Sequence, residues 1–317
     1  MAVAYTRGLH ELGDGLYAYL QPDGGWGWSN AGLITAGGTS LLVDTLFSLD
    51  LTRDMLDAMK PVTESNPIDA AMNTHANGDH CYGNQLLPAE IPIYGTATAV
   101  EEMQLAQPAL VHWLFKTPDE NKDPAFVEWA GENFAPFRFD DVELRVPSEL
   151  FQGRLDLRVG DREVTFVDLG PAHTGSDSIV HVPDAQVAFT GDLLFIEGTP
   201  IAWEGPIQNW LDACESILAL DTRLLVPGHG PVTDASGVRD VMRYFEYVRE
   251  QARERFDAGM DAEAAADDID LRDFDDWGDR ERIAVNVETA YREFDPSREP
   301  ALVLELFVRM ARWHKRH

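Results

Sequence analysis

The sequence predicts an α/β layered fold, and three observations lead to this prediction. Short β-rich runs separated by glycine-containing turns recur in two parts of the chain, at 9–95 and 154–230. Helix-like segments lie between these runs. A helical pattern then continues from 236 to the end. Strands and helices that alternate in this way bury one face of each element against the next layer.

The first part of the chain indicates hairpins followed by a helix. Residues 9–20 (LHELGDGLYAYL) and 30–45 (NAGLITAGGTSLLVDT) each place a glycine-containing turn between two short β-rich runs, which is typical of β-hairpins. Ser48 is a candidate N-cap for a helix over 49–60, where leucine and methionine recur at helical spacing. Two further strands are predicted at 68–74 and 91–95.

Residues from about 97 to 147 differ in character and predict a helical insertion, with helices at 98–107 and 124–134. Strands are expected again at 154–170 and 178–192, followed by a helix at 207–220 and a short strand at 223–230. The acidic run at 262–279 is interpreted as the solvated face of the helical tail. We therefore expect one domain over 1–235, and a helical C-terminal extension over 236–317 packed on it.

The composition limits the partners and the compartment. Against 25 Lys and Arg stand 55 Asp and Glu, so the formal net charge is −30. Such a surface repels phosphate backbones and anionic lipid, so we expect neither nucleic acid nor a membrane as a partner. The chain shows no signal-peptide pattern and no apolar run of membrane-spanning length. Cys81 and Cys214 are too few for a disulfide framework, so we expect reduced thiols in a cytoplasmic protein.

Four of the nine histidines lie where a strand gives way to a loop that contains glycine. They are His75 and His80 in NTHANGDH, His173 in GPAHTGSD and His229 in VPGHGP, and Asp192 in FTGD has the same setting. Residues at strand ends on one edge of a sheet converge in space. Gly78 relaxes the loop so that His75, Asp79 and His80 can all point inward. Imidazoles and carboxylates with no cysteine pair nearby are typical ligands of zinc, iron or manganese.

On these motifs the chain resembles the metallo-β-lactamase superfamily over roughly Leu9 to Asp234. The motifs are SLLVDT, THxxxDH, AHTGSD, TGD and PGHG, in this order. The resemblance implies a four-layer αββα sandwich with a metal centre at one edge of the stacked sheets. The insertion near 97–147 and the C-terminal extension lie outside the shared pattern, and we expect them to shape the substrate entrance.

The resemblance also implies a ligand set and a reaction. One metal site would use His75 and His173, a second would use Asp79, His80 and His229, and Asp192 would bridge the two. Such a centre attacks a carbonyl, thioester or phosphoester with a metal-bound hydroxide. Asp79 and His80 are the expected catalytic residues, and Asp79 would orient the nucleophile or accept its proton. The expected cofactor is zinc, one or two ions per chain, with iron or manganese as the other metals that these ligands suit.

Asn77 stands where the family pattern has a histidine, and three alternatives follow. In the first, the first site is weak or empty and the chain is a one-metal hydrolase on Asp79, His80 and His229. In the second, Asn77 is a ligand through its oxygen or a water, and two metals bind with unequal affinity. In the third alternative the chain is a mononuclear non-haem iron oxygenase of the persulfide dioxygenase type, using His75, His173 and Asp192.

The hydrolase is favoured over the oxygenase because the chain keeps His80 and His229. A catalytically inactive binding protein with the same fold is a further alternative. The intact Asp79 and Asp192, together with these two histidines, argue against it.

Three tryptophans are candidate substrate-binding residues. Trp26 and Trp28 lie in a glycine-rich loop, and Trp203 follows Asp192. An aromatic-lined groove suits a small apolar or aromatic acyl substrate, such as an ester, thioester or lactone. Alternatively, Trp26 and Trp28 pack under the C-terminal helices. The helical extension also offers a surface for a homo-oligomer.

Overall fold

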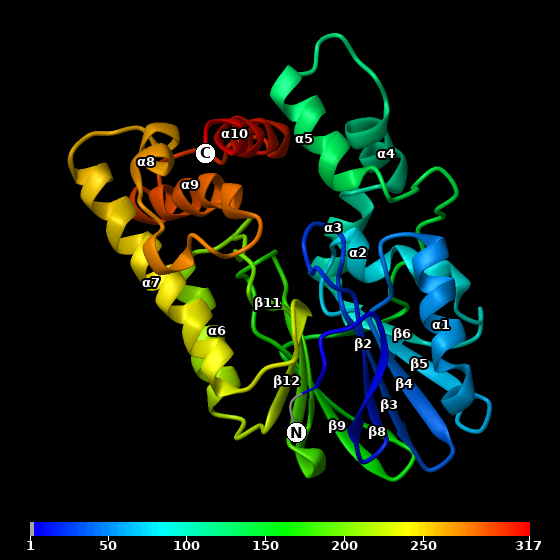
Figure 1. Cartoon of the computed structure of the whole chain (residues 1–317). Helices are drawn as coiled ribbons and strands as arrows, with labels where there is room; N and C mark the ends of the chain where they lie inside the picture. The colour runs from blue at the N-terminus through cyan, green and yellow to red at the C-terminus, as the bar shows by residue number, and fades with distance from the viewer. Residues whose placement is uncertain (1–2) are drawn as a thin grey trace.

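The computed structural model describes residues 3–317, and its two β-sheets stack face to face with helices on either side (Figure 1). The first sheet has the order β1-β2-β3-β4-β5-β6-β7 and the second the order β12-β11-β10-β9-β8. The strands of the first sheet are β1 (Gly8–Gly13), β2 (Leu16–Leu20), β3 (Ala31–Ala36), β4 (Thr39–Val43), β5 (Ile68–Met72), β6 (Ile93–Thr96) and β7 (Glu149–Phe151). Those of the second are β8 (Arg154–Val159), β9 (Arg162–Asp168), β10 (Ser178–Val182), β11 (Val187–Phe195) and β12 (Leu224–His229).

Strand direction separates the hairpins from the strands that end at the site. The strands β1 to β4 pair antiparallel, as expected for the two hairpins. From β4 to β7 the pairing is parallel, and so is the pairing of β11 with β12. Parallel neighbours bring their carboxyl ends to the same edge of a sheet, and the loops that leave this edge lie together.

Apolar side chains fill the space between the sheets. Leu16, Ile34, Val164 and Phe166 are fully buried there, and burying a side chain of this size stabilises the fold by about 1.5–3 kcal/mol. Gly32 in β3 is required by the packing, because a Cβ at this position would lie 2.3 Å from the ring of Phe189.

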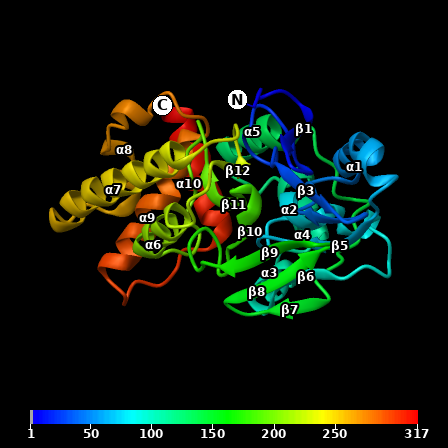
Figure 2. The ribbon, with the colours of Figure 1, turned by 90° about the horizontal axis from the view of Figure 1, so that it is seen from below.

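Helices cover the outer faces of both sheets (Figure 2). On the first sheet lie α1 (Leu49–Thr63), α2 (Gly78–Cys81) and the 3₁₀ turn η1 (Tyr82–Leu86), and on the second lie α6 (Ile207–Leu218) and α7 (Ala235–Asp257). Ser48 caps α1, since its side chain accepts a hydrogen bond from the Leu51 N–H, as the sequence predicted. The αββα layering expected from the motifs is therefore confirmed.

The insertion and the C-terminal extension meet above the sheet edge. The insertion forms α3 (Ala97–Leu105), α4 (Pro108–Lys116) and α5 (Pro124–Phe134), and the extension adds α8 (Ala262–Asp268), α9 (Ile283–Phe294) and α10 (Val303–Arg316) to α7. The short 3₁₀ turns are η2 (Pro183–Ala185), η3 (Arg272–Phe274) and η4 (Arg280–Arg282). Arg312 of α10 forms a 2.8 Å ion pair with Asp123, the N-cap of α5. Among residues 3–317, no helix is long and apolar enough to cross a membrane.

Two details differ from the sequence predictions. The helix α4 was not expected, although Pro108 at its first turn is a normal start signal. The acidic run at 262–279 is not wholly solvated, because the side chain of Asp279 is only 15% exposed and pairs with Arg282 at 2.8 Å. Burial raises the pKa of Asp279 to about 6 despite this partner. The division of the chain at residue 235 stays a prediction.

Candidate metal centre

The structure brings the four loop histidines and the two aspartates together at one sheet edge. His75 follows β5, and Asp79 and His80 lie in α2 directly after it. His173 precedes β10, Asp192 lies within β11, and His229 ends β12. All six side chains are buried.

Asp192 lies at the middle of this cluster. Its Oδ1 is 3.0 Å from His80 Nε2. Its Oδ2 is 3.3 Å from His173 Nε2, 3.5 Å from His229 Nε2 and 3.7 Å from His75 Nε2. One carboxylate therefore faces all four imidazoles, which is the geometry that a bridging ligand needs.

Two overlapping sets of ligand atoms are close enough to hold a metal ion. One set is His75, His80 and Asp192, and the other is Asp79, His80 and His229. Asp79 Oδ2 lies 3.3 Å from His229 Nε2 and 3.9 Å from His80 Nε2. His80 thus belongs to both sets, whereas the sequence placed it in one site only, with Asp79, His229 and the bridging Asp192.

Each imidazole is held through its Nδ1, so that its Nε2 faces the cluster. The Nδ1–H groups of His80, His173 and His229 donate to Asp44 Oδ2, the Ile201 carbonyl and the Gly24 carbonyl, at 2.9, 2.6 and 3.0 Å. His75 Nδ1 is 3.0 Å from Thr74 Oγ1, whose hydroxyl donates to Asp44. Such outer partners fix the tautomer that leaves Nε2 free to bind a metal.

Unpaired polar atoms at the cluster fit a metal ion. His75 Nε2, His80 Nε2 and Asp192 Oδ1 are buried and make no hydrogen bond with the described residues. His80 Nε2 and Asp192 Oδ1 lie 3.0 Å apart without hydrogen-bond geometry. Buried polar groups without partners are costly, and a cation bound by these lone pairs removes that cost.

The two sides of the cluster differ in electrostatics. We call Asp79, His80 and His229 the carboxylate half, and His75, Asn77 and His173 the amide half. Burial alone would lower the pKa of His229, but Asp192 and Asp79 outweigh burial and raise it to about 9. The same carboxylates and Asp44 overcome burial to raise the pKa of His80 well above its ordinary value. In the amide half burial prevails, and the pKa values of His75 and His173 lie below the ordinary one.

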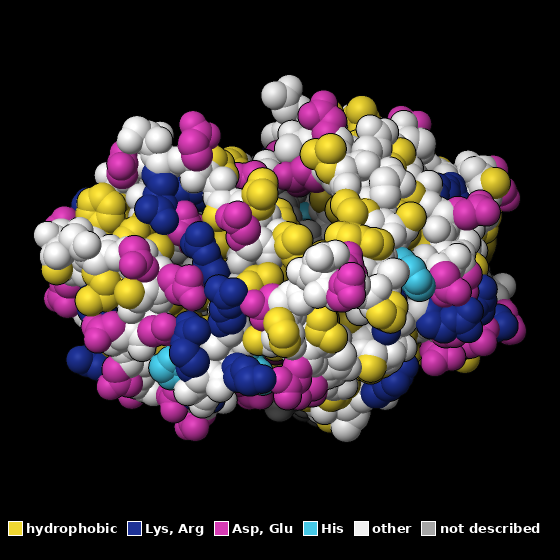
Figure 3. All heavy atoms as spheres, turned by 90° about the horizontal axis from the view of Figure 1, so that it is seen from above, with side chains coloured by type: hydrophobic (Ala, Val, Ile, Leu, Met, Phe, Trp, Pro, Cys, Tyr) yellow, Lys and Arg dark blue, Asp and Glu magenta, His cyan; other side chains and the backbone are white. Residues whose placement is uncertain are grey.

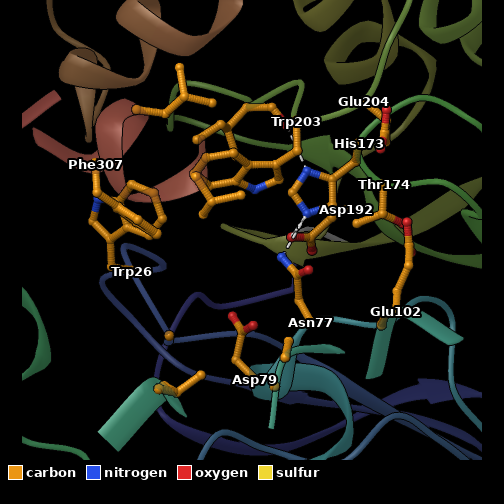
Figure 4. A pocket seen from close by; sticks show the side chains of 18 of the residues that line it. Trp26, Asn77, Asp79, Glu102, His173, Thr174, Asp192, Trp203, Glu204 and Phe307 are labelled. Carbon is orange, nitrogen blue, oxygen red and sulfur yellow. Dashed lines mark hydrogen bonds and ion pairs between the residues drawn. The ribbon is translucent and has the colours of Figure 1, made fainter. Parts of the chain in front are cut away.

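Asn77 holds the N-cap position of α2, but its side chain makes no capping hydrogen bond and points at His173 (Figure 4). Its Nδ2 lies 3.0 Å from His173 Nε2. Because His173 Nδ1–H donates to Ile201, its Nε2 carries the lone pair and accepts from the amide. In this conformation Asn77 occupies the atom of His173 that would bind a metal.

The centre opens into a cavity of about 510 Å³. Asp79, His173, Asp192 and His229 form one end of its lining. Much of the remaining lining is apolar, and α3, α4 and the start of α10 each contribute to it. Figure 3 shows the hollow from above, with hydrophobic side chains around it.

The three tryptophans take different positions. Trp26 and Trp203 both line the cavity, with ring centroids 6.5 Å apart. The structure puts Trp28 outside the cavity lining, packed on Phe137 at 5.0 Å and covered by Arg7 at 5.7 Å. The sequence did not distinguish Trp28 from Trp26, because the two lie in one loop. The chain turns at Gly27 between them and directs the two rings to different places.

Several residues that support the centre were not singled out from the sequence. Glu281 is buried and accepts hydrogen bonds from the indoles of Trp26 and Trp129, at 2.9 and 3.1 Å. Arg282 lies 4.3 Å from the Trp26 ring. These contacts fix the loop whose Gly24 carbonyl orients His229. Asp44 could have been identified from the sequence by its position at a strand end, since it directly follows β4 at the same sheet edge.

Comparison with known proteins gives a family and a set of similar structures. The family model described as the Metallo-beta-lactamase superfamily matches residues 24–229. The stereoselective inverting sec-alkylsulfatase Pisa1 from Pseudomonas sp. matches 93% of this chain with a TM-score of 0.67 and 18% identity. This chain spans about half of that protein, 52% of its length. A metallo-beta-lactamase from Pontibacter korlensis matches over 75% of this chain and 99% of its own, with a TM-score of 0.55 and 14% identity. At these identities the structural matches show the fold.

Proposed function

Because this chain belongs to the metallo-β-lactamase superfamily and is a metallohydrolase with a buried His/Asp centre, we propose that it hydrolyses an apolar carboxylic ester, thioester or lactone. The observation that supports this substrate class most directly is the cavity, whose largely apolar lining ends at four of the expected metal ligands. An acyl group placed against Asp79 and His229 would leave its apolar part among the aromatic and aliphatic side chains.

The roles of the residues follow from their positions. Zinc, when bound, would supply a water molecule of lowered pKa and a positive charge for the developing oxyanion. Asp79 is the lining carboxylate nearest to His229, at 3.3 Å, so it would orient the attacking water and accept its proton. Trp26 and Trp203 would pack against the acyl group.

The ligand assignment is also part of this proposal. We assign Asp79, His80 and His229 to one metal, His75 and His173 to the other, and Asp192 to both. The hydrogen bond from Asn77 to His173 supports unequal sites, with a zinc ion held more firmly in the carboxylate half. Two buried free thiols, Cys81 and Cys214, support a reducing compartment such as the cytoplasm.

A panel of substrates on the purified, zinc-loaded protein tests the proposal. Aryl esters, thioesters, lactones and a secondary alkyl sulfate with matched apolar groups are compared for turnover. We expect hydrolysis of acyl substrates that stops on chelation and returns with zinc. The Asp79→Asn variant should lose most of this activity, and Asp212→Asn, an exposed aspartate on α6, should keep it.

Three results would contradict the proposal. If only the alkyl sulfate is turned over, the substrate is a sulfate ester and the proposed acyl substrate is wrong. One iron per chain with oxygen consumption would replace hydrolysis by the oxygenase reaction on His75, His173 and Asp192. Full activity of the Asp79→Asn variant would show that Asp79 is not the general base.

A further inference from the structure

Three exposed apolar side chains lie at the mouth of the cavity, beside the exposed Glu204. On the insertion side Leu105 and Leu110 are 77% and 51% exposed, and on the extension side Val303 is 57% exposed. All three side chains also line the cavity. They are therefore part of one surface that begins outside the cavity and continues into it.

The apolar surface continues inward from this rim. On the side of α10, Leu306 and Phe307 follow Val303 at helical spacing and are only 6% and 8% exposed. On the side of α4, Leu114 follows Leu110 at one-turn spacing and also lines the cavity. Both helices thus present an apolar row that runs from the surface toward the cavity.

Exposed apolar side chains at this density need an explanation. Scattered ones are normal on a protein surface, whereas a contiguous apolar patch marks a binding site. Here the exposed apolar side chains all line the cavity, and they come from α3–α4 and from α10. A narrow apolar chain that leaves the cavity would contact both sides at once.

We propose that the substrate carries an aliphatic chain that is longer than the cavity and leaves it past Leu105 and Leu110 on one side and Val303 on the other. This inference rests on the proposed function, since it takes the cavity as the substrate site. It narrows the substrate class from apolar or aromatic acyl compounds to long-chain aliphatic ones.

Binding of straight-chain ketones tests the inference without any turnover. The affinities of 2-hexanone, 2-nonanone and 2-dodecanone for the zinc-loaded protein are measured by isothermal titration calorimetry. Each methylene that becomes buried should tighten binding by about fourfold. We expect this gain to continue through 2-dodecanone in the wild type.

The rim variants are Leu105→Ser with Leu110→Ser, and Val303→Ser alone. They should bind 2-hexanone as the wild type does and 2-dodecanone about tenfold more weakly, because only the longer chain reaches the rim. Leu150→Ser is the matched control, since Leu150 in β7 is also 57% exposed and does not line the cavity. It should change neither affinity.

Other results would overturn the inference. A wild-type affinity that stops rising at 2-hexanone would show that the chain ends inside the cavity. Rim variants that change self-association on size exclusion, with unaltered ketone binding, would assign the rim to a second copy of the chain. Variants that lose binding to phosphatidylcholine vesicles, again with unaltered ketone binding, would assign it to a lipid surface. Normal ketone binding without metal-dependent hydrolysis would reject the proposed function and leave this inference standing.

Discussion

The carboxylate half and the amide half of the centre are built on the same plan and differ in charge. In both halves each imidazole is held through Nδ1 and faces Asp192 through Nε2. In the carboxylate half Asp79 and Asp44 add negative charge around His80. In the amide half the corresponding neighbour of His173 is the neutral Asn77. A shared scaffold can therefore support two metal sites of different strength.

Because of this difference in charge, histidines of the carboxylate half must lose a proton before they bind a metal, whereas those of the amide half are already neutral. The carboxylates raise the pKa of His229 to about 9, so a metal must displace its proton near neutral pH. Burial lowers the pKa of His75, and its imidazole is neutral and ready to bind. The carboxylate half offers more charge to a cation, and the amide half offers less competition from protons.

Replacing the shared carboxylate of Asp192 should weaken metal binding in both halves. Asp192→Asn keeps the side-chain shape but removes the one negative charge that faces all four imidazoles, at 3.0 to 3.7 Å. We expect both metals to be lost and kcat/KM to fall by about 10³ or more. Elemental analysis and steady-state kinetics measure the two effects. Wild-type metal content in this variant would show that Asp192 does not bridge.

Restoring a histidine should make the halves equal. Asn77→His removes the amide that occupies His173 Nε2 and adds an imidazole to the amide half. We expect zinc content to rise from about one to about two per chain. Asn121→His is the control, because Asn121 is exposed and lies in the insertion. Two firmly bound zinc ions in the wild type would contradict the inequality.

The residues of the candidate metal centre could be predicted because each follows a local rule. Strand ends, adjacent glycines and the order of the motifs marked His75, His173 and His229 without any knowledge of packing. The same rule applies to Asp44, which follows β4 with a φ of +62°. This residue was quoted within a motif but was given no role, although it holds His80.

The cavity walls could not be predicted in the same way. Trp26 lies against Glu281, 255 residues later in the chain, and Phe307 packs on Trp129 of the insertion. Such contacts depend on how two additions to the fold meet in space, and nothing local in the sequence encodes that meeting. The solvated-face interpretation failed at Asp279 because its local partner, Arg282, is buried against the ring of the distant Trp26.

Removing the outer partner of His80 should weaken one half more than the other. Asp44 Oδ2 accepts from His80 Nδ1 at 2.9 Å, and the same carboxylate holds Thr74. In Asp44→Asn we expect zinc affinity in the carboxylate half to fall by about tenfold, the lower end for such outer partners. Competition with a chromogenic chelator measures it, and Asp50→Asn, exposed at the start of α1, is the control. Equal weakening of every zinc ion would place Asp44 in a general structural role.

The smallest expected effect is a pH dependence of the metal-free protein. The folded-state pKa of His229, about 9, lies above its ordinary value of 6.5. A group of this kind stabilises the folded chain fully below pH 6.5, and the contribution is lost as pH rises through 9. The lowered pKa values of His75 and His173 contribute no loss in this window, whereas the raised pKa of His80 and that of buried Asp177, about 8, add to it. Between pH 7 and pH 9 we therefore expect the Tm of the metal-free chain to fall by a few degrees, on the order of 2 kcal/mol of unfolding free energy.

Zinc-loaded protein is the matched control for this measurement. Its imidazoles are ligands and carry no proton to lose, so its Tm should fall less over the same pH range, by the share that Asp177 contributes in both forms. Differential scanning calorimetry at pH 7, 8 and 9 on both forms gives the comparison. A constant Tm in the metal-free chain would mean that the carboxylates do not keep His229 protonated. The electrostatic difference between the halves would then reduce to the hydrogen bond between Asn77 and His173.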